Sequence, residues 1–396
     1  DKETRKRYIE HYKNSLQLQQ KVTHKNILKI QEIEITSKKF FFVSEKVDSI
    51  ISSETKFSRD EAMYIIQQLA ITLNFLHVYH KIAFMSVWPN NIFLNPNFTL
   101  KLGLFIHATE IQSETSVIQN PFSSWKPGSF SFIPANYVAP EIINNKYPIT
   151  TKAEVYMFAL TSLFVFTGKN PSDATIIDEF DPNQAITACK DLPQVEYSLL
   201  LNSCLSENPS NRPNFESIAY NDAFSSLICK ILSYIEVVTS KDSRDSFVFF
   251  QKLTDYIKFF SFRIIRKKFL PLFMYYIRKD INFAIALLPM IFSIQNMFDD
   301  QQFIEEIATP LKPIFYITQP IEIPQIFIDN IGIFLNRIPA ERYEEFVYPI
   351  VFPALYVNSQ ILMEKTLAVL PHIIAVMTPE AAQTQLIPTM MKILQY

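Results

Sequence analysis

The stretch that decides the fold runs over residues 82–94 and reads Ile-Ala-Phe-Met-Ser-Val-Trp-Pro-Asn-Asn-Ile-Phe-Leu. A second stretch follows closely, over residues 100–106, and reads Leu-Lys-Leu-Gly-Leu-Phe-Ile. Short apolar runs separated by a Pro-x-Asn turn and a short connection predict strands that end in a hairpin. The helix before them is expected to end at Leu76-His77. Neither stretch contains an aspartate or a glutamate.

The first stretch resembles the catalytic loop of protein kinases, whose pattern is His-Arg-Asp-Leu-x-x-x-Asn. Phe84, Met85 and Ser86 occupy the first three positions of that pattern, and Asn91 keeps the last. In a kinase the aspartate at the third position accepts the proton of the substrate hydroxyl. A serine hydroxyl does not act as a general base near neutral pH. The sequence therefore predicts a loop with the backbone arrangement of a kinase catalytic loop but without the residue that acts as general base.

The second stretch resembles the Asp-Phe-Gly motif, whose aspartate holds magnesium against the nucleotide phosphates. Leu104 and Ile106 replace the first and third residues of that motif, and only Phe105 is kept. Magnesium requires oxygen ligands, and a leucine side chain has none. Asn91 would offer a single neutral carbonyl, which is too little to hold the ion. We therefore expect no catalytic residue, no metal ligand and no cofactor, with ATP and magnesium bound only if the chain is a divergent active kinase.

Further motifs of the kinase large lobe follow in order. Residues 138–141 resemble the Ala-Pro-Glu sequence that closes an activation segment, and residues 208–213 resemble the Arg-containing turn late in the lobe. In kinases the Glu and the Arg of these motifs form a buried ion pair, which here would join Glu141 to Arg212. Removing one partner of such a pair leaves a buried charge uncompensated, so the fold can require the pair without any chemistry. Glu154 stands where the central buried helix usually has an aspartate.

The chain changes character after about residue 228, where long apolar helices with regular prolines are expected. Four prolines are each 39 residues apart in similar apolar surroundings: Pro271, Pro310, Pro349 and Pro388. Two helices in about 40 residues is the spacing of a HEAT-type solenoid. The second helix of each unit is expected over residues 283–292, 326–335 and 362–377.

The predicted fold class is therefore an α+β protein-kinase-like domain followed by an all-α HEAT-type solenoid. The first domain is expected over residues 1–227 and consists mostly of the helical large lobe, with an incomplete N-terminal lobe. The solenoid is expected over residues 228–396.

Composition excludes several other classes of protein. A net charge of −2 gives no electrostatic footprint for nucleic acid. The 3 cysteines are too few and too irregular for a disulfide framework or a zinc site, which favours a reducing cytoplasmic compartment. Polar residues interrupt the most apolar stretch, residues 281–298, so we expect a buried helix there instead of a membrane span. No cleavable leader is expected, because charged residues 1–7 precede a helical pattern.

A kinase-like domain without its carboxylates, joined to HEAT repeats, resembles the Scy-like family of pseudokinases over nearly the whole chain. Residues 124–127, 134–141 and 249–253 resemble the branch named for its association with clathrin-coated vesicles. The resemblance implies a scaffold for protein–protein interactions in traffic between the trans-Golgi network, endosomes and plasma membrane. It also implies clathrin or adaptor complexes as partners, and a location peripheral to Golgi, endosomal or coated-vesicle membranes.

Two short features suggest further partners. Asn120-Pro121-Phe122 resembles the tripeptide ligands of EH domains, although an ordinary loop turn is the simpler interpretation. A basic cluster on one helix would suit anionic lipid headgroups, whereas the simpler interpretation is a solvated helix face. Its members are Arg263, Arg266, Lys267 and Lys268.

The main prediction is a catalytically inactive scaffold. The alternative is a divergent active Ser/Thr protein kinase that binds ATP and uses an acid outside these motifs. A nucleotide-regulated scaffold and a plain HEAT adaptor with a kinase-like base also remain open. Nucleotide binding separates the first two hypotheses.

Overall fold

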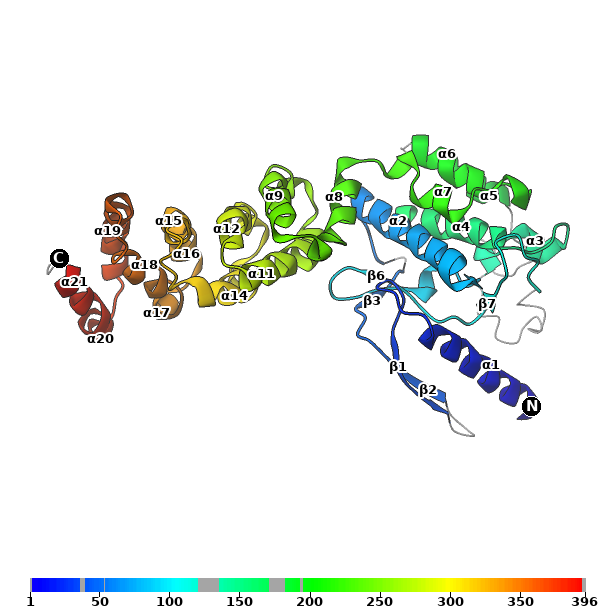
Figure 1. Ribbon diagram of the computed structural model, residues 1–396, viewed down its shortest axis with the longest axis horizontal. Coiled ribbons are helices and arrows are strands. Elements are labelled where there is room, and N and C mark those ends of the chain that lie inside the picture. The colour runs from blue at the N-terminus through cyan, green and yellow to red at the C-terminus, as the bar shows by residue number, and fades with distance from the viewer. Residues whose placement is uncertain are drawn as a thin grey trace. The chain divides into compact units, whose positions relative to one another are not determined.

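The computed structural model of the chain forms two compact units, residues 1–237 and 238–396, which are described separately here (Figure 1). The structure describes the following residues: 2–35, 40–52, 54–119, 135–170, 182–192 and 195–393. The first unit extends past the expected boundary at residues 227/228, because it includes helix α8 (Leu227–Ile235), which packs on helix α2 (Arg59–Phe75).

Short strands of the first unit form small antiparallel sheets, ordered β1–β2, β3–β5–β6 and β4–β7 in the described residues. The predicted hairpin is the β5–β6 pair, in which Ile92 lies opposite Leu102. Helix α1 (Lys2–Gln20) precedes all of them. The strand bounds are β1 Ile30–Ile35, β2 Phe40–Ser44, β3 Ser49–Ile50, β4 Ile82–Ala83, β5 Ile92–Leu94, β6 Leu100–Leu102 and β7 Thr109–Glu110.

Helices α2 and α4 (Lys152–Thr167) form the centre of the first unit and contact each other. Ser58 and Glu61 form a capping box that fixes the start of α2. Residues 153–165 of α4 are all buried, because this helix is apolar on every side. The remaining longer helices of this unit are α3 Pro140–Asn144, α5 Pro182–Lys190, α6 Val195–Cys204 and α7 Phe215–Ala219.

The described part of the second unit is entirely helical, and its helices form two rows in chain order (Figure 1). One row is α9 Ser243–Leu253, α12 Phe283–Ser293, α15 Glu322–Asp329 with α16 Ile331–Arg337, and α19 Gln360–Ile374. The other is α10 Phe262–Ile264 with α11 Leu270–Lys279, α13 Asp300–Gln302 with α14 Thr309–Leu311, α17 Tyr343–Phe346 with α18 Tyr348–Ala354, and α20 Pro379–Ala381 with α21 Ile387–Ile393. Helix α12 contacts both α9 and α15, so neighbouring pairs stack as in a HEAT-type solenoid.

The four periodic prolines occupy equivalent places in these helix pairs. Each is the second residue of its helical segment: Pro271 in α11, Pro310 in α14, Pro349 in α18 and Pro388 in α21. A π-helical turn comes directly before three of them, over residues 265–269, 303–308 and 382–386. Because proline lacks an N–H and crowds the carbonyl four residues earlier, a wider turn lets the helix continue through it.

Phenylalanine rings fill the core of the second unit. Phe315 packs edge-on against Phe327 with ring centroids 5.4 Å apart, and Phe303 against Phe334 at 5.6 Å. Phe292 contacts both Phe327 and Phe334, which joins adjacent helix pairs through one aromatic cluster. No helix in the described part of the chain combines the length and apolar character needed to cross a bilayer.

Candidate functional site

The loop that resembles the kinase catalytic loop, here called the degenerate loop for its predicted loss of the base, has Phe84, Met85 and Ser86 fully buried in the first unit. The ring of Phe84 stands edge-on to that of Phe105, with centroids 5.2 Å apart. Met85 adopts a φ of 50°, a backbone conformation that is strained for a side chain of this size. The backbone N–H of Met85 donates a 2.6 Å hydrogen bond to Glu154 Oε1, which holds the residue in place.

Glu154 is the anchor of this loop. It lies on α4 with no exposed surface, and its second oxygen, Oε2, lies 2.5 Å from His77 Nε2 at the end of the preceding helix. A buried carboxylate is tolerated when both oxygens have partners, and these two contacts supply them. The glutamate therefore ties a helix end and a strained loop to the central helix.

The Ser86 hydroxyl faces the interior of the protein. Its Oγ accepts a 3.3 Å hydrogen bond from the backbone N–H of His107, so the side chain holds the segment that follows the second motif. The imidazole of His107 is also buried, and this burial, reinforced by nearby His11, lowers the pKa of His107 to about 3. The imidazole of His107 is therefore neutral at physiological pH, and it lies 6.0 Å from the Trp88 ring between centroids.

Asn91 links the two motifs through its side-chain amide. Its Oδ1 accepts a 2.8 Å hydrogen bond from the backbone N–H of Leu104, and its Nδ2 donates to the carbonyls of Ser86 and Leu104 at 3.1 and 3.0 Å. A Cβ atom on Gly103 would lie only 2.3 Å from that Oδ1, so only glycine permits the approach. In a kinase this amide would ligate magnesium, whereas here its hydrogen bonds go to the backbone.

Leu104 belongs to a hydrophobic cluster. It packs with Leu16 of α1 and with Leu28 and Ile30 at the start of β1. The carbonyl of Ile106 lies 2.5 Å from Nε2 of His11, which also comes from α1. Ser15 Oγ also donates to the carbonyl of Ile106, and Gln19 Oε1 accepts from the backbone N–H of Phe105, both at 3.3 Å. Apolar packing and three side-chain contacts therefore join α1 to the place where a kinase would hold its metal.

A cavity of about 460 Å³ opens above these residues. Its walls are largely apolar and include Leu28, Phe42, Val47, Trp88, Phe93 and Leu104. Ser44, Asn90 and Asn91 add neutral polar groups, and the lining residues that are described include no charged side chain. Trp88 is one of these lining residues and is only 4% exposed, so it packs into the wall of the cavity.

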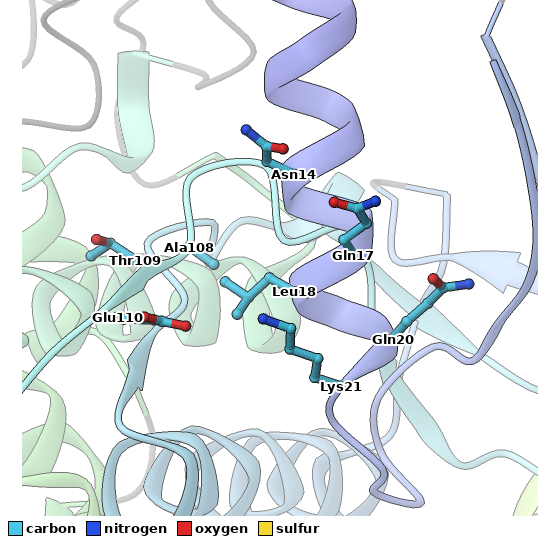
Figure 2. Close-up of a pocket in the computed structure, with 8 residues that line it drawn as sticks. All are labelled: Asn14, Gln17, Leu18, Gln20, Lys21, Ala108, Thr109 and Glu110. Carbon is cyan, nitrogen blue, oxygen red and sulfur yellow. The ribbon is translucent and has the colours of Figure 1, made fainter.

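A larger groove, of about 780 Å³, lies between α1 and the segment containing β7 (Figure 2). Amide side chains of Asn14, Gln17 and Gln20 come from the helix, and Thr109 with Glu110 comes from the opposite side. The lining of this groove differs from that of the apolar cavity, because it includes one cation, Lys21, and one carboxylate, Glu110, beside neutral amides. Nothing in it resembles a catalytic arrangement.

The structure brings Glu141 and Arg212 together, as the sequence predicts. Arg212 donates from Nη1 to Glu141 Oε1 at 2.6 Å and from Nη2 to Oε2 at 2.9 Å, and neither side chain is exposed. The guanidinium also lies 4.8 Å from the centre of the Tyr156 ring on α4. The pair therefore connects three separate segments of the first unit.

Two features were proposed for other partners, a basic cluster and residues 120–122. Within the basic cluster, Arg266 pairs with Glu306 and Lys268 is buried, so Lys268 does not belong to a solvated helix face. Residues 120–122, the candidate EH-domain ligand, lie outside the described residues. In the described part of the chain, no three His, Cys, Asp or Glu side chains gather as a metal site would require.

Sequence patterns alone miss two of these contacts. The His77–Glu154 contact joins residues 77 positions apart and the His11–Ile106 contact joins residues 95 apart. The glutamate in the place of a kinase aspartate was a signal for the first. Nothing in the sequence around His11 indicated the second.

Comparisons with known proteins agree with this geometry. A family model described as the protein kinase domain matches residues 1–224. SCY1-like protein 2 of Mus musculus is 23% identical over 345 residues, which cover 83% of this chain and 36% of that protein. Protein kinase-like protein SCY1 of Saccharomyces cerevisiae is 23% identical over 283 residues, which cover 64% of this chain and 35% of that protein. The chain thus spans only about a third of the length of these relatives.

The chain belongs to the protein kinase domain family. The matches to SCY1-like protein 2 and yeast SCY1 are longer than the first unit, which confirms the Scy-like resemblance seen in the sequence. The protein is therefore of the Scy1 type, a kinase-like unit followed by helices.

Proposed function

We propose that this protein is a catalytically inactive, kinase-like scaffold that brings proteins together during vesicle traffic. The observation that carries the proposal is the arrangement of Ser86, Asn91 and Leu104. The serine hydroxyl is buried against backbone, the asparagine amide bonds to backbone on both sides, and the leucine packs in an apolar cluster.

The physical argument concerns charge. A nucleotide triphosphate with its metal needs carboxylate oxygens for the ion and cations for the phosphates. The cavity of about 460 Å³ offers mostly apolar surface and neutral amides. Moving highly charged groups out of water into such surroundings is costly without compensating partners. The described residues of the cavity therefore favour exclusion of magnesium nucleotide.

A thermal-shift titration tests the first half of the proposal. A ligand present at 100 times its dissociation constant stabilises the folded state by about 2.7 kcal/mol. For a unit of this size that corresponds to a rise in melting temperature of roughly 5–11 °C, at about 2–4 °C per kcal/mol. We expect less than about 1 °C with millimolar ATP and magnesium, and the same result with ADP.

A saturable rise with ATP would contradict the exclusion of nucleotide. Transfer of radiolabelled phosphate to a general substrate would overturn the proposal altogether, provided that purified Asn91→Ala protein, verified as folded, loses the transfer. Binding without transfer would instead favour the nucleotide-regulated scaffold. The two measurements therefore separate the inactive scaffold, the active kinase and the nucleotide-regulated scaffold from one another.

The second half of the proposal rests on the Scy-like relatives and on the resemblance to the clathrin-associated branch. Stacked helix pairs such as those of the second unit present extended surfaces that suit protein partners. We propose clathrin or an adaptor complex as the partner, and a cytoplasmic location peripheral to Golgi, endosomal or coated-vesicle membranes. Calorimetric titration of the full chain with purified clathrin terminal domain and adaptor appendage domains should show saturable binding. Absence of binding to every one of these domains would remove the trafficking assignment and leave the catalytic argument unchanged.

A further inference from the structure

A groove of about 390 Å³ lies between α6 and α7 on the first unit, formed by residues that have no part in the degenerate catalytic loop. Four of its lining residues come from α6: Glu196, Leu199, Leu200 and Ser203. Positions separated by three, four and seven residues share one face of a helix, so these side chains form a continuous wall. The wall carries a carboxylate at one end and leucines in the middle.

The opposite wall comes from the segment around α7. Pro213, Ser217 and Asn221 are spaced four residues apart and line the groove, and Asp222 follows them. Asn221 uses its Oδ1 to cap the next short turn by accepting from the N–H of Ala223, which fixes the end of this wall. A second carboxylate therefore stands on the side opposite Glu196.

A large apolar side chain is exposed in this groove. Leu199 is 64% exposed, although its neighbours Leu200 and Leu201 are 7% and 0% exposed. An exposed leucine in a groove that also has polar residues is typical of a surface that binds a partner.

The negative charge of the groove indicates the charge of the partner that it would bind. Glu196 and Asp222 are both exposed, and neither has a salt-bridge partner in the described part of the chain. Glu216, also exposed, lies on α7 and adds to the negative charge. Carboxylates at both walls favour cations, while the leucines between them favour an apolar side chain.

We propose that this groove docks a short basic segment of another protein, in which an apolar side chain is flanked by lysine or arginine. The apolar side chain contacts Leu199, Leu200 and Pro213, and the flanking cations lie near Glu196 and Asp222. This inference goes beyond the proposed function, since it holds whether or not the cavity binds nucleotide.

A display experiment with random dodecapeptides tests the specificity without assuming a partner. Peptides are selected on the full chain after depletion on the Leu199→Glu variant, and their affinities are measured by fluorescence anisotropy. We expect enriched peptides to carry an apolar residue between basic residues. Replacing both Glu196→Lys and Asp222→Lys should weaken their binding at least about tenfold, which corresponds to about 1.4 kcal/mol.

Matched controls lie elsewhere on the same unit. Val117, which is 72% exposed, serves as Val117→Glu, and the exposed pair on β1 serves as Glu32→Lys with Glu34→Lys. These variants should bind the selected peptides as the unchanged protein does. The inference is wrong if no peptide survives depletion, if the survivors lack basic residues, or if the Glu196→Lys/Asp222→Lys variant binds them undiminished. Because these side chains are exposed, circular dichroism and melting should show every variant folded.

Discussion

Breaking the buried pair of Glu141 and Arg212 should destabilise the first unit severely, and the two halves of the pair should differ in cost. Arg212 keeps other partners when the glutamate is lost. Its Nε donates to the carbonyl of Ser206 at 2.8 Å and its Nη1 to the carbonyl of Lys152 at 2.8 Å, and the Tyr156 ring covers its face. Glu141 has no equivalent support, because Arg212 donates both hydrogen bonds that the structure records for its carboxylate.

The expected magnitude follows from this difference. Removing one partner of a buried ion pair costs about 3–5 kcal/mol. Glu141→Gln should fall near the lower value, because the guanidinium retains its carbonyl partners and a neutral acceptor remains. Arg212→Met should fall near the upper value, because it leaves both a buried carboxylate and backbone carbonyls without donors. At about 2–4 °C per kcal/mol, the melting temperature of the first unit should drop by roughly 6–12 °C and 10–20 °C respectively.

Differential scanning calorimetry of both single variants and the double variant measures these losses and the coupling between them. Lys146→Gln, which breaks the exposed pair with Glu207, serves as the control and should leave the melting temperature unchanged. The reasoning is refuted if Glu141→Gln melts within 2 °C of the unchanged protein, or if Arg212→Met proves the milder variant.

Two further predictions concern single positions. Gly103→Ala should lower the unfolding free energy of the first unit, measured in urea, by about 1–3 kcal/mol, because the new Cβ would meet Asn91 Oδ1 at 2.3 Å. Gly332→Ala should instead raise the unfolding free energy of the second unit by about 0.5–1 kcal/mol, because open space surrounds that helical glycine. Loss of stability in both variants would contradict this. Burial, with help from nearby cations, lowers the pKa of His24 to about 4. On acidification the folded state therefore binds this proton at a lower pH than the unfolded state does, so the stability of the fold falls as the pH drops from 6.5 to 4. The unfolding free energy should change by less than about 1.4 kcal/mol per pH unit, because water screens a partly exposed ring. His24→Asn keeps an acceptor for the N–H of Asn26 and should remove this pH dependence in urea titrations across that range.

The frame of the fold could be predicted because local patterns encode it. The two apolar runs that follow the turn at residues 89–91 form the β5–β6 hairpin, and the 39-residue proline period predicts the helix pairs. The π-helical turns before the prolines could not be predicted, since no local pattern distinguishes them from an ordinary turn. The contact of His11 with Ile106 was equally hidden, because it depends on how α1 packs against a segment 95 residues away.

Several hydrogen bonds that hold the candidate site are made to its backbone, so the backbone conformation can persist with different side chains. Glu154 binds the N–H of Met85, and Asn91 binds the N–H and carbonyl of Leu104 and the carbonyl of Ser86. None of these bonds involves the side chain at position 85, 86 or 104. These backbone bonds therefore tolerate different side chains at the three positions, although the Ser86 hydroxyl adds a bond to the N–H of His107 and Leu104 adds apolar packing. Glu154 and Asn91 cannot be replaced so easily. For the same reason, turns and buried anchors identify a kinase fold but do not establish kinase activity.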